Sequence, residues 1–362
     1  MVKYLFFYVI ILLTSCSTSK LGDSNKPSKE KITKRNEELM KDFSVEKKVL
    51  EKFKIKKIKS KKSKKRMKDI PLPDKKSPIN DIKKKSLKKI LKTTPKSSQL
   101  KTKSFPNYPT DFPSRLVDFD DVSKKFWNSF TPYVFEGEET ILKIKYLGVN
   151  TGSITISSHK ATKLGDQPVF HLNARLKTAS FYSYLYELDD YCDSYVTKKE
   201  FKPLKFSLIQ RQSAQDIDDL QLFDHDEFKT YTFYKRVTDK KSKKSKSERL
   251  IPYYFQDPLS IVYFVRGLPM IIGNYYEIPI VNKGKVETLS AKILGREVLS
   301  TDLGKRKAVK IEISTKHKGK TLKGGQMTFW YSDDDKRIFL KFEADIKIGS
   351  VSGKIESYKV NK

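Results

Sequence analysis

The chain has 362 residues, enough for two domains, and carries a net charge of +32 from 75 basic and 43 acidic residues. It contains only two cysteines, Cys16 and Cys192, which excludes a fold held together by several internal disulfides. The charge is unevenly spread, since 31 basic residues and only 10 acidic residues lie between Lys20 and Ser104. This separation predicts one folded domain with a basic tether before it.

The first sixteen residues have the layout of an export signal. Lys3 supplies a positive charge, residues 4–13 form an apolar run, and small residues follow. The run is too short to span a bilayer, which needs about 20 residues. The ending Leu13-Thr14-Ser15-Cys16 resembles the lipobox of bacterial lipoproteins, which implies removal of residues 1–15 and acylation of Cys16. The alternatives are an ordinary signal peptide with an incidental cysteine, or an uncleaved anchor.

The same resemblance implies a location. In enterobacterial lipoproteins an aspartate after the acylated cysteine favours the inner membrane, so Ser17 favours the outer membrane. We therefore expect a lipoprotein of the cell envelope, anchored in a membrane through Cys16 and facing the periplasm. No later stretch is apolar enough to span a bilayer.

Residues 16–104 read as a disordered tether. Lysine, serine and proline dominate the segment after Cys16, and Phe43 and Phe53 are its only aromatic residues. Such a composition cannot bury enough apolar surface to offset the loss of conformational entropy. The lysines of Lys54–Lys89 suit anionic lipid or an anionic envelope polymer. Nucleic acid is an unfavoured partner, because the chain is exported and aromatic residues for base stacking are missing.

One part of the tether has helical spacing. Leu39, Phe43, Leu50 and Phe53 fall near one face of a helix, with lysines on the other faces. Either this is a transient helix, or it is an amphipathic helix that lies on an anionic membrane. The apolar face is thin and is interrupted by Glu46, which favours the transient helix.

The folded domain is expected from residue 105 to residue 362. Its pattern is one of short alternating apolar segments separated by turns rich in Gly, Asn and Asp, which is typical of antiparallel sheets. The fold class is therefore mainly β, with a curved antiparallel sheet that forms a half-barrel or a barrel. The predicted strands include 140–146, 153–157, 169–176, 204–209, 219–223, 228–234, 275–281, 286–294, 308–313, 327–331, 338–346 and 351–358.

Two segments interrupt the alternation. Residues 180–188 predict a helical turn that packs aromatic side chains against the sheet. Residues 259–268 predict a helix, because Asp257 is a favourable N-cap and Pro258 suits the first helical turn. Gly267 and Pro269 end that helix.

A series of landmarks from Pro132 to Tyr358 resembles the bacterial family known as domain of unknown function 3108. The resemblance implies an exported β-rich protein with no assigned activity, and it adds no catalytic residue. Its landmarks are Phe135-Glu136-Gly137-Glu138, Tyr146-Leu147-Gly148, residues 181–190, Gln256-Asp257-Pro258-Leu259-Ser260, Leu268-Pro269, Leu294-Gly295-Arg296-Glu297-Val298 and Trp330-Tyr331-Ser332-Asp333-Asp334.

Several polar clusters favour structural roles. Asp189, Asp190 and Asp193 suit a turn between a helix and a strand better than an acid–base pair or a cation site. Asp224-His225-Asp226 suits a hairpin tip, because consecutive residues of a strand point to opposite faces and cannot converge on a metal. Asp333-Asp334-Asp335 also predicts a turn, since it lacks the glycine and the closing glutamate of a calcium loop.

No motif of a catalytic, metal or cofactor site occurs. The four histidines are far apart in the sequence, and no Gly-x-Ser-x-Gly or phosphate-binding loop is present. A lone thiol such as Cys192 is expected to be buried. The second basic run, Lys240–Lys246, predicts an exposed hairpin loop rather than an anion site.

These observations favour a non-catalytic binding or scaffold lipoprotein of unknown biochemical activity, with no metal and no cofactor. Its target would be an apolar ligand, such as a lipid or acyl chain, or a partner protein. One alternative is a structural tether that binds anionic polymer or lipid through its basic linker. The other is a hydrolase of envelope polymers whose site has no recognisable motif.

Overall fold

The structure is a computed structural model that describes residues 29–57, 107–160, 162–317, 320–346 and 349–361. The described residues 29–57 belong to one compact unit with those from 112 onward. Residues 59–111 belong to a second, in which only 107–111 are described and end in a turn. The predicted signal peptide, Cys16 and most of Lys54–Lys89 lie outside the described residues. None of the described helices is both long enough and apolar enough to cross a membrane.

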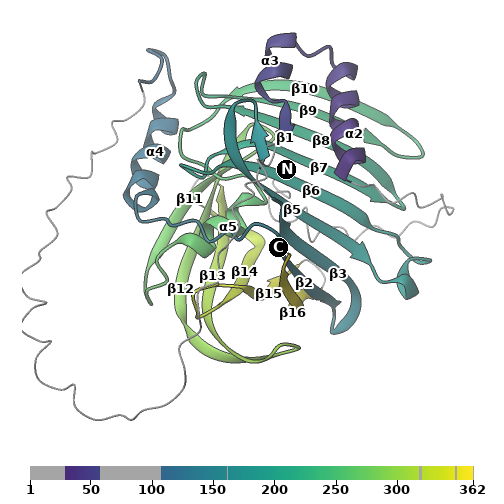
Figure 1. The fold of residues 1–362 in the computed structure, drawn as a ribbon, viewed down its shortest axis with the longest axis vertical. Helices are drawn as coiled ribbons and strands as arrows, with labels where there is room; N and C mark the ends of the chain where they lie inside the picture. The colour runs from purple at the N-terminus through teal and green to yellow at the C-terminus, as the bar shows by residue number, and fades with distance from the viewer. Residues whose placement is uncertain (1–28, 58–106, 161, 318–319, 347–348, 362) are drawn as a thin grey trace, which may run out of the picture. The chain divides into compact units, whose positions relative to one another are not determined.

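The first unit contains one antiparallel sheet of 16 strands (Figure 1). Two meanders, β2 to β10 and β11 to β16, are joined by pairing of β2 with β16, while the short β1 and β4 pair beside β5. This confirms the mainly β, antiparallel fold. The strands are β1 (Ile55–Lys57), β2 (Glu138–Tyr146), β3 (Val149–Ser158), β4 (Thr162–Leu164), β5 (Gln167–Thr178), β6 (Asp189–Thr197), β7 (Pro203–Gln212), β8 (Gln215–Asp224), β9 (Lys229–Val237), β10 (Ser242–Leu250), β11 (Tyr275–Asn282), β12 (Lys285–Thr301), β13 (Gly304–His317), β14 (Lys320–Ser332), β15 (Phe339–Asp345) and β16 (Ser350–Val360).

The sheet is curved but open. Among the described residues no ladder joins its two edge strands, β10 and β11, so a closed barrel is wrong for this domain. Both edges resist further pairing. β10 is exposed and rich in lysine, and Pro279 in β11 has no amide hydrogen to donate. The prediction of a loop at Lys240–Lys246 is therefore wrong from residue 242 onward, because these residues pair with β9.

Two layers of helix cover opposite faces of the sheet. Successive residues of a strand point to opposite faces. In β6, Cys192 and Val196 belong to the apolar cluster that contains helix α5 (Ser260–Gly267), whereas Tyr195 belongs to the cluster that contains helix α2 (Lys29–Asp42). We call the α5 side the inner face and the α2 side the outer face. Strands β6 to β8 are buried on both faces.

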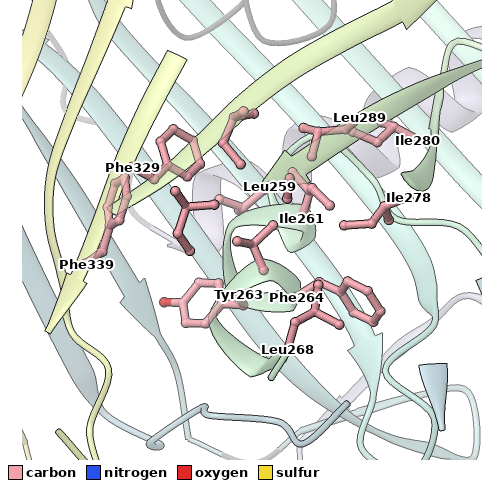
Figure 2. Close-up of a cluster of buried hydrophobic side chains, with 14 of the residues drawn as sticks. Leu259, Ile261, Tyr263, Phe264, Leu268, Ile278, Ile280, Leu289, Phe329 and Phe339 are labelled. Atoms are coloured by element: carbon pink, nitrogen blue, oxygen red, sulfur yellow. The ribbon is translucent and has the colours of Figure 1, made fainter. Parts of the chain in front are cut away.

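Helix α5 fills the inner side of the curve. Seven of its eight residues are buried, and Figure 2 shows its side chains among those of the surrounding strands. The helix is one residue shorter at each end than predicted. The predicted cap is confirmed, since Asp257 Oδ1 accepts hydrogen bonds from the amides of Leu259 and Ser260, both at 2.8 Å.

The N-terminal segment is a correction to the predicted tether. Residues 29–57 form α2, a short helix α3 (Lys47–Lys52) and β1, so disorder over the whole of residues 16–104 is wrong. The few apolar side chains of this segment would be inadequate alone, but they share a core with the outer face of the sheet. That cluster contains Leu39, Met40, Phe53, Leu164, Val169, Tyr195, Leu220, Leu222 and Phe233.

Ion pairs add to this packing. The Arg35 guanidinium lies 2.9 Å from Asp218 Oδ2, and the Lys52 ammonium lies 2.7 Å from Asp224. Both aspartates are buried, so the basic residues of the segment neutralise carboxylates of the sheet. The lysine-rich composition that suggested a solvated tail therefore serves, in part, to attach the segment.

Helix α4 (Ser114–Trp127) is an element that the sequence pattern did not reveal. It lies beside the sheet and brings Phe126 and Trp127 against Phe264 of α5. Its Asp120 is buried and accepts hydrogen bonds from the amides of Tyr253 and Tyr254 at 2.9 and 2.7 Å. The chain between β10 and α5 is thereby held against α4.

Candidate functional site

The inner face of β6 and β8 carries a row of buried polar side chains. Strand pairing places Ser194 opposite Phe206 of β7, which is opposite Gln221 of β8, and places Cys192 in the neighbouring row with Leu208 and Asp219. Asp190 and Asp257 are also buried on this side. Buried carboxylates in such proximity are the strongest candidate for acid–base chemistry in the described part of the chain.

Asp257 connects α5 to the sheet. Its Oδ2 accepts a hydrogen bond from the Ser194 hydroxyl, while its Oδ1 caps the helix. Burial raises the pKa of Asp257 to about 6, although the hydrogen bonds from Ser194, Ser260 and Leu259 oppose that shift. Because both oxygens already accept hydrogen bonds, this carboxylate has a structural role.

Asp190 is held by three donors. It accepts hydrogen bonds from Gln210 Nε2 at 3.2 Å, from Gln212 Nε2 at 2.9 Å and from the amide of Arg211 at 3.1 Å. Desolvation outweighs these hydrogen bonds and raises the pKa of Asp190 to about 7. Gln210 Oε1 has no hydrogen-bond partner among the described residues, so the neutral carboxyl has an acceptor close by.

This pKa predicts a dependence of stability on pH. The pKa of Asp190 is higher in the folded state than in the unfolded chain. Its contribution to the free energy of unfolding is therefore fully present below about pH 4 and is lost as the pH rises through about 7. Each unit of pKa difference corresponds to about 1.4 kcal/mol, which gives a loss of roughly 4 kcal/mol across this range. In urea unfolding between pH 4 and pH 8, the free energy of unfolding of Asp190→Asn should not fall by this amount. If the free energies of parent and variant change with pH in parallel, the raised pKa of Asp190 is contradicted.

The three aspartates of the predicted cluster do not converge. They lie within β6 and not in a turn, so alternation sends Asp190 to the inner face and Asp189 and Asp193 to the outer face. Asp189 forms a two-bond pair with Arg175, both bonds at 2.7 Å. Asp193 Oδ1 lies 2.6 Å from His171 Nε2. The placement in a turn was wrong, because residues 189–197 form a strand that was not predicted.

The histidine pair on the outer face was not visible in the sequence. His159 and His171 are twelve positions apart, but antiparallel pairing of β3 with β5 brings their ring centroids to 4.4 Å. The His171 ring also stacks on Tyr195, at 4.3 Å. Burial raises the pKa of the Asp193 carboxyl, but His171 and the hydrogen bond from Asn173 outweigh this effect and hold that pKa low.

A second carboxylate on the inner face joins the two meanders. The Lys283 ammonium, in the turn between β11 and β12, lies 3.2 Å from Asp219 Oδ2. Next to it, Gln221 donates to Asn282 Oδ1 at 2.9 Å and accepts from the amide of Lys283 at 2.6 Å. Burial raises the pKa of Asp219, and Lys283 opposes that shift. No local sequence signal announces this contact, because it joins residues more than sixty positions apart.

The other predicted polar clusters occupy turns. Asp224, His225 and Asp226 surround the β8–β9 turn, where His225 Nε2 contacts the carbonyl of Pro203 at 2.7 Å and burial lowers the pKa of His225 to about 4. Asp334 accepts hydrogen bonds within the β14–β15 turn, as predicted. Among the described residues no group of three or more His, Cys, Asp or Glu side chains is arranged to hold a metal.

Cys192 is buried, as predicted, on the inner face. Burial raises the pKa of its thiol well above the usual value, with the nearby carboxylates of Asp257 and Asp193 adding to the shift. The thiol is thus held in its unreactive protonated form. Within the inner-face row, Ser194 and Asp257 hold the start of α5, while Asp219 and Gln221 hold the β11–β12 turn.

The second candidate is a surface. The predicted helical turn of residues 180–188 contains only a 3₁₀ turn at Ser180–Tyr182, and its aromatic side chains do not all pack on the sheet. Phe181, Tyr184 and Leu185 are exposed, together with Leu147 and Val149 from the neighbouring β2–β3 hairpin. We call these five residues the loop-end surface. The run Ser-Phe-Tyr-Ser-Tyr-Leu-Tyr is the sequence signal for this surface, and the prediction that its aromatic side chains pack against the sheet is wrong for Phe181 and Tyr184.

Comparisons with known proteins identify a family without a known activity. The family model "Protein of unknown function (DUF3108)" matches residues 142–356, more than half of the chain. Among curated proteins there is no significant match.

Solved structures give a distant likeness. A β-barrel-like DUF1849 protein from Brucella abortus is 10% identical, with a TM-score of 0.44 over 64% of this chain and 100% of that one. A presumed exported protein with a YmcC-like fold from Bacteroides fragilis is 12% identical, with a TM-score of 0.26 and coverage of 64% and 98%. A presumed lipoprotein from Parabacteroides distasonis is 11% identical, with a TM-score of 0.27 and coverage of 64% and 99%. Such values carry no information about function.

Proposed function

The chain belongs to the DUF3108 family of proteins of unknown function, as its landmarks predicted, and we propose from this premise that it is a non-catalytic binding module of the bacterial envelope. An acylated Cys16 ties it to a membrane, the outer membrane by the Ser17 criterion, and the β domain faces the periplasm. Its targets bind at its surface and not inside the sheet.

The observation that carries this proposal is the filled interior of the sheet. The place where an apolar ligand would sit is occupied by α5, whose Ile261, Phe264 and Val265 are essentially inaccessible to solvent. A lipid or acyl chain inside the curve would have to displace that helix. The packing therefore favours a partner that binds at the surface over an apolar ligand that binds inside the sheet.

The buried polar groups support a non-catalytic role. Asp257 caps α5, Asp190 accepts three hydrogen bonds and Asp219 pairs with Lys283. A catalytic carboxylate must instead be free to meet a substrate. The alternative of an unrecognised hydrolase therefore has no support from these groups.

The attachment of α2 changes the expected geometry of the anchor. Only twelve residues, 17–28, separate Cys16 from the start of α2 at Lys29. Their fully extended length is about 40 Å and their r.m.s. span is about 20 Å. In the sequence, the basic segment 58–106 lies between β1 and α4. Because both of these elements belong to one unit, the segment is an insertion in the folded domain and not a tether between the anchor and the domain. We propose that it remains the contact for anionic lipid or polymer.

The anchor can be tested directly. In its native host, the full chain should incorporate a fatty-acid label and enter the detergent phase in Triton X-114 partitioning. Cys16→Ser should remove the label and shift nearly all of the protein to the aqueous phase. Cys192→Ser is the matched control, because this buried cysteine is outside the signal and should leave both readouts unchanged. Equal partitioning of Cys16→Ser and parent would overturn the anchor.

A further inference from the structure

The loop-end surface has an unusual concentration of exposed apolar side chains. Phe181, Tyr184 and Leu185 are 72%, 68% and 61% exposed, and Leu147 and Val149 are 58% and 49% exposed. Single exposed apolar residues are ordinary, but several in neighbouring loops mark an interaction site. The Phe181 ring contacts Tyr182 and Tyr184 edge to face, so this group projects as a unit.

Strand pairing brings the two parts of the surface together. At the end of the sheet Gly152 of β3 pairs with Thr178 of β5, and the amide of Ala179 donates to the carbonyl of Thr151 at 2.9 Å. The hairpin that carries Leu147 and Val149 therefore lies beside the loop that carries Phe181.

Leu147 is an unexpected residue for its position. It has a φ of 49° and is followed by Gly148 at 83°, so both residues of this two-residue turn are left-handed. Asn, Asp and Gly are favoured in such turns. The turn also has a close neighbour, since a Cβ on Gly349 would come within 2.1 Å of the Leu147 side chain. A leucine that tolerates this backbone while most of its surface is exposed indicates a role outside the fold.

Helix α2 starts near the same end of the sheet. Ile32, in its first turn, packs with Tyr191 and Ile209, close to the start of β6. Arg35 and Asp42 of the same helix pair with Asp218 and Lys235, which lie in the same row across the sheet as Tyr191 and Ile209. Helix α2 therefore crosses the strands near the loop end, and its start lies within a few residues of that end. Twelve residues then lead back to Cys16, so an acyl chain there would place the loop end, and not the opposite end, close to the bilayer.

The charge beside the surface suits anionic lipid. Lys145 and Lys177 are exposed on the strands that lead to the two loops. Two further exposed lysines, 240 and 241, lie in the β9–β10 turn at this end of the sheet. Exposed aromatic and aliphatic side chains surrounded by lysines are typical of surfaces that insert into the interfacial region of a membrane.

We propose that the loop-end surface inserts into the interfacial layer of the anionic membrane that holds the lipid anchor. The β domain then lies on that membrane in one orientation. This inference rests on the proposed lipidation of Cys16, which sets the distance.

The test uses the full-length lipidated chain in vesicles of phosphatidylethanolamine and phosphatidylglycerol that contain a shallow nitroxide lipid. Cys16 is then acylated and Cys192 is buried, so an introduced cysteine can be labelled alone with a fluorophore. The fluorophore at Tyr184→Cys should be quenched at least threefold more than one at Ile272→Cys. Ile272 is a matched control, since it is 57% exposed but precedes β11, at the other end of the strands.

A second variant removes the apolar side chains. With all three residues Phe181, Tyr184 and Leu185 changed to serine, a fluorophore at Ser183→Cys should lose most of its quenching while the unfolding transition stays unchanged, because these side chains are exposed. Equal quenching at positions 184 and 272 would overturn the membrane contact. Failure of the chain to remain in the vesicles would instead overturn the anchor, so the two failures are distinguishable.

Discussion

Glu138→Ala is expected to lower the free energy of unfolding by about 3–5 kcal/mol. Both Glu138 oxygens accept hydrogen bonds from Arg266 at the end of α5, at 2.8 and 3.1 Å, and both side chains are buried. Arg266 also donates to the carbonyl of Lys336. Removing the carboxylate leaves a buried guanidinium with one carbonyl partner and no counter-charge. Urea unfolding of parent and variant at pH 7 measures the loss.

The adjacent residue provides the control. Glu139 pairs with Lys359 at the surface, where ion pairs contribute less than about 1 kcal/mol, so Glu139→Ala should have little effect. A double variant, Glu138→Leu with Arg266→Met, should recover most of the stability, because it removes the unpaired charge and keeps the volume. Equal losses for Glu138→Ala and Glu139→Ala would show that the buried pair does not hold α5 in place.

Phe264→Ala is expected to cost about 3–5 kcal/mol, with an increase in cavity volume inside the sheet. Phe264 is fully buried, and its ring stacks on Phe130 with centroids 4.4 Å apart and contacts Trp127 at 4.3 Å. These rings come from α5, α4 and the segment after α4, so they cannot easily close over the gap. Thermal and urea unfolding measure the loss, and Val262→Ala, on the partly exposed side of the same helix, should cost about 1 kcal/mol or less.

The same variant examines the filled interior. A cavity lined by apolar side chains stays dry and can bind small apolar molecules such as benzene. Benzene should therefore raise the melting temperature of Phe264→Ala and leave that of the parent unchanged. Benzene stabilisation of the parent would show that the interior already has free space, which would restore an internal apolar ligand as a candidate.

Local signals predicted the sheet well. The period-two alternation of 140–146 and the turn residues at 333–335 depend on neighbouring residues only, and both appear as predicted. The cap of α5 is equally local, because Asp257 bonds to amides two and three residues away. Where the interaction spans a few residues, the sequence contains the information.

Charged and long-range features were not predictable in the same way. β10 has no apolar alternation, since it is an exposed edge, and its pairing with β9 is set by the turn that precedes it. The separation of Asp189 from Asp190 depends on their lying in β6, a strand that was not predicted. The candidate surface required pairing of β3 with β5, which joins residues 152 and 178.

The sequence by itself determined an antiparallel β domain, a capped helix within it, the family and the expectation of an acylated Cys16. Only the tertiary structure decided that the sheet is open, that α5 fills it and that residues 29–57 are part of the folded unit. The physical reason is that the apolar side chains of α2 and α3 are too few to form a core alone. They become sufficient when the outer face of the sheet supplies the other half of that core.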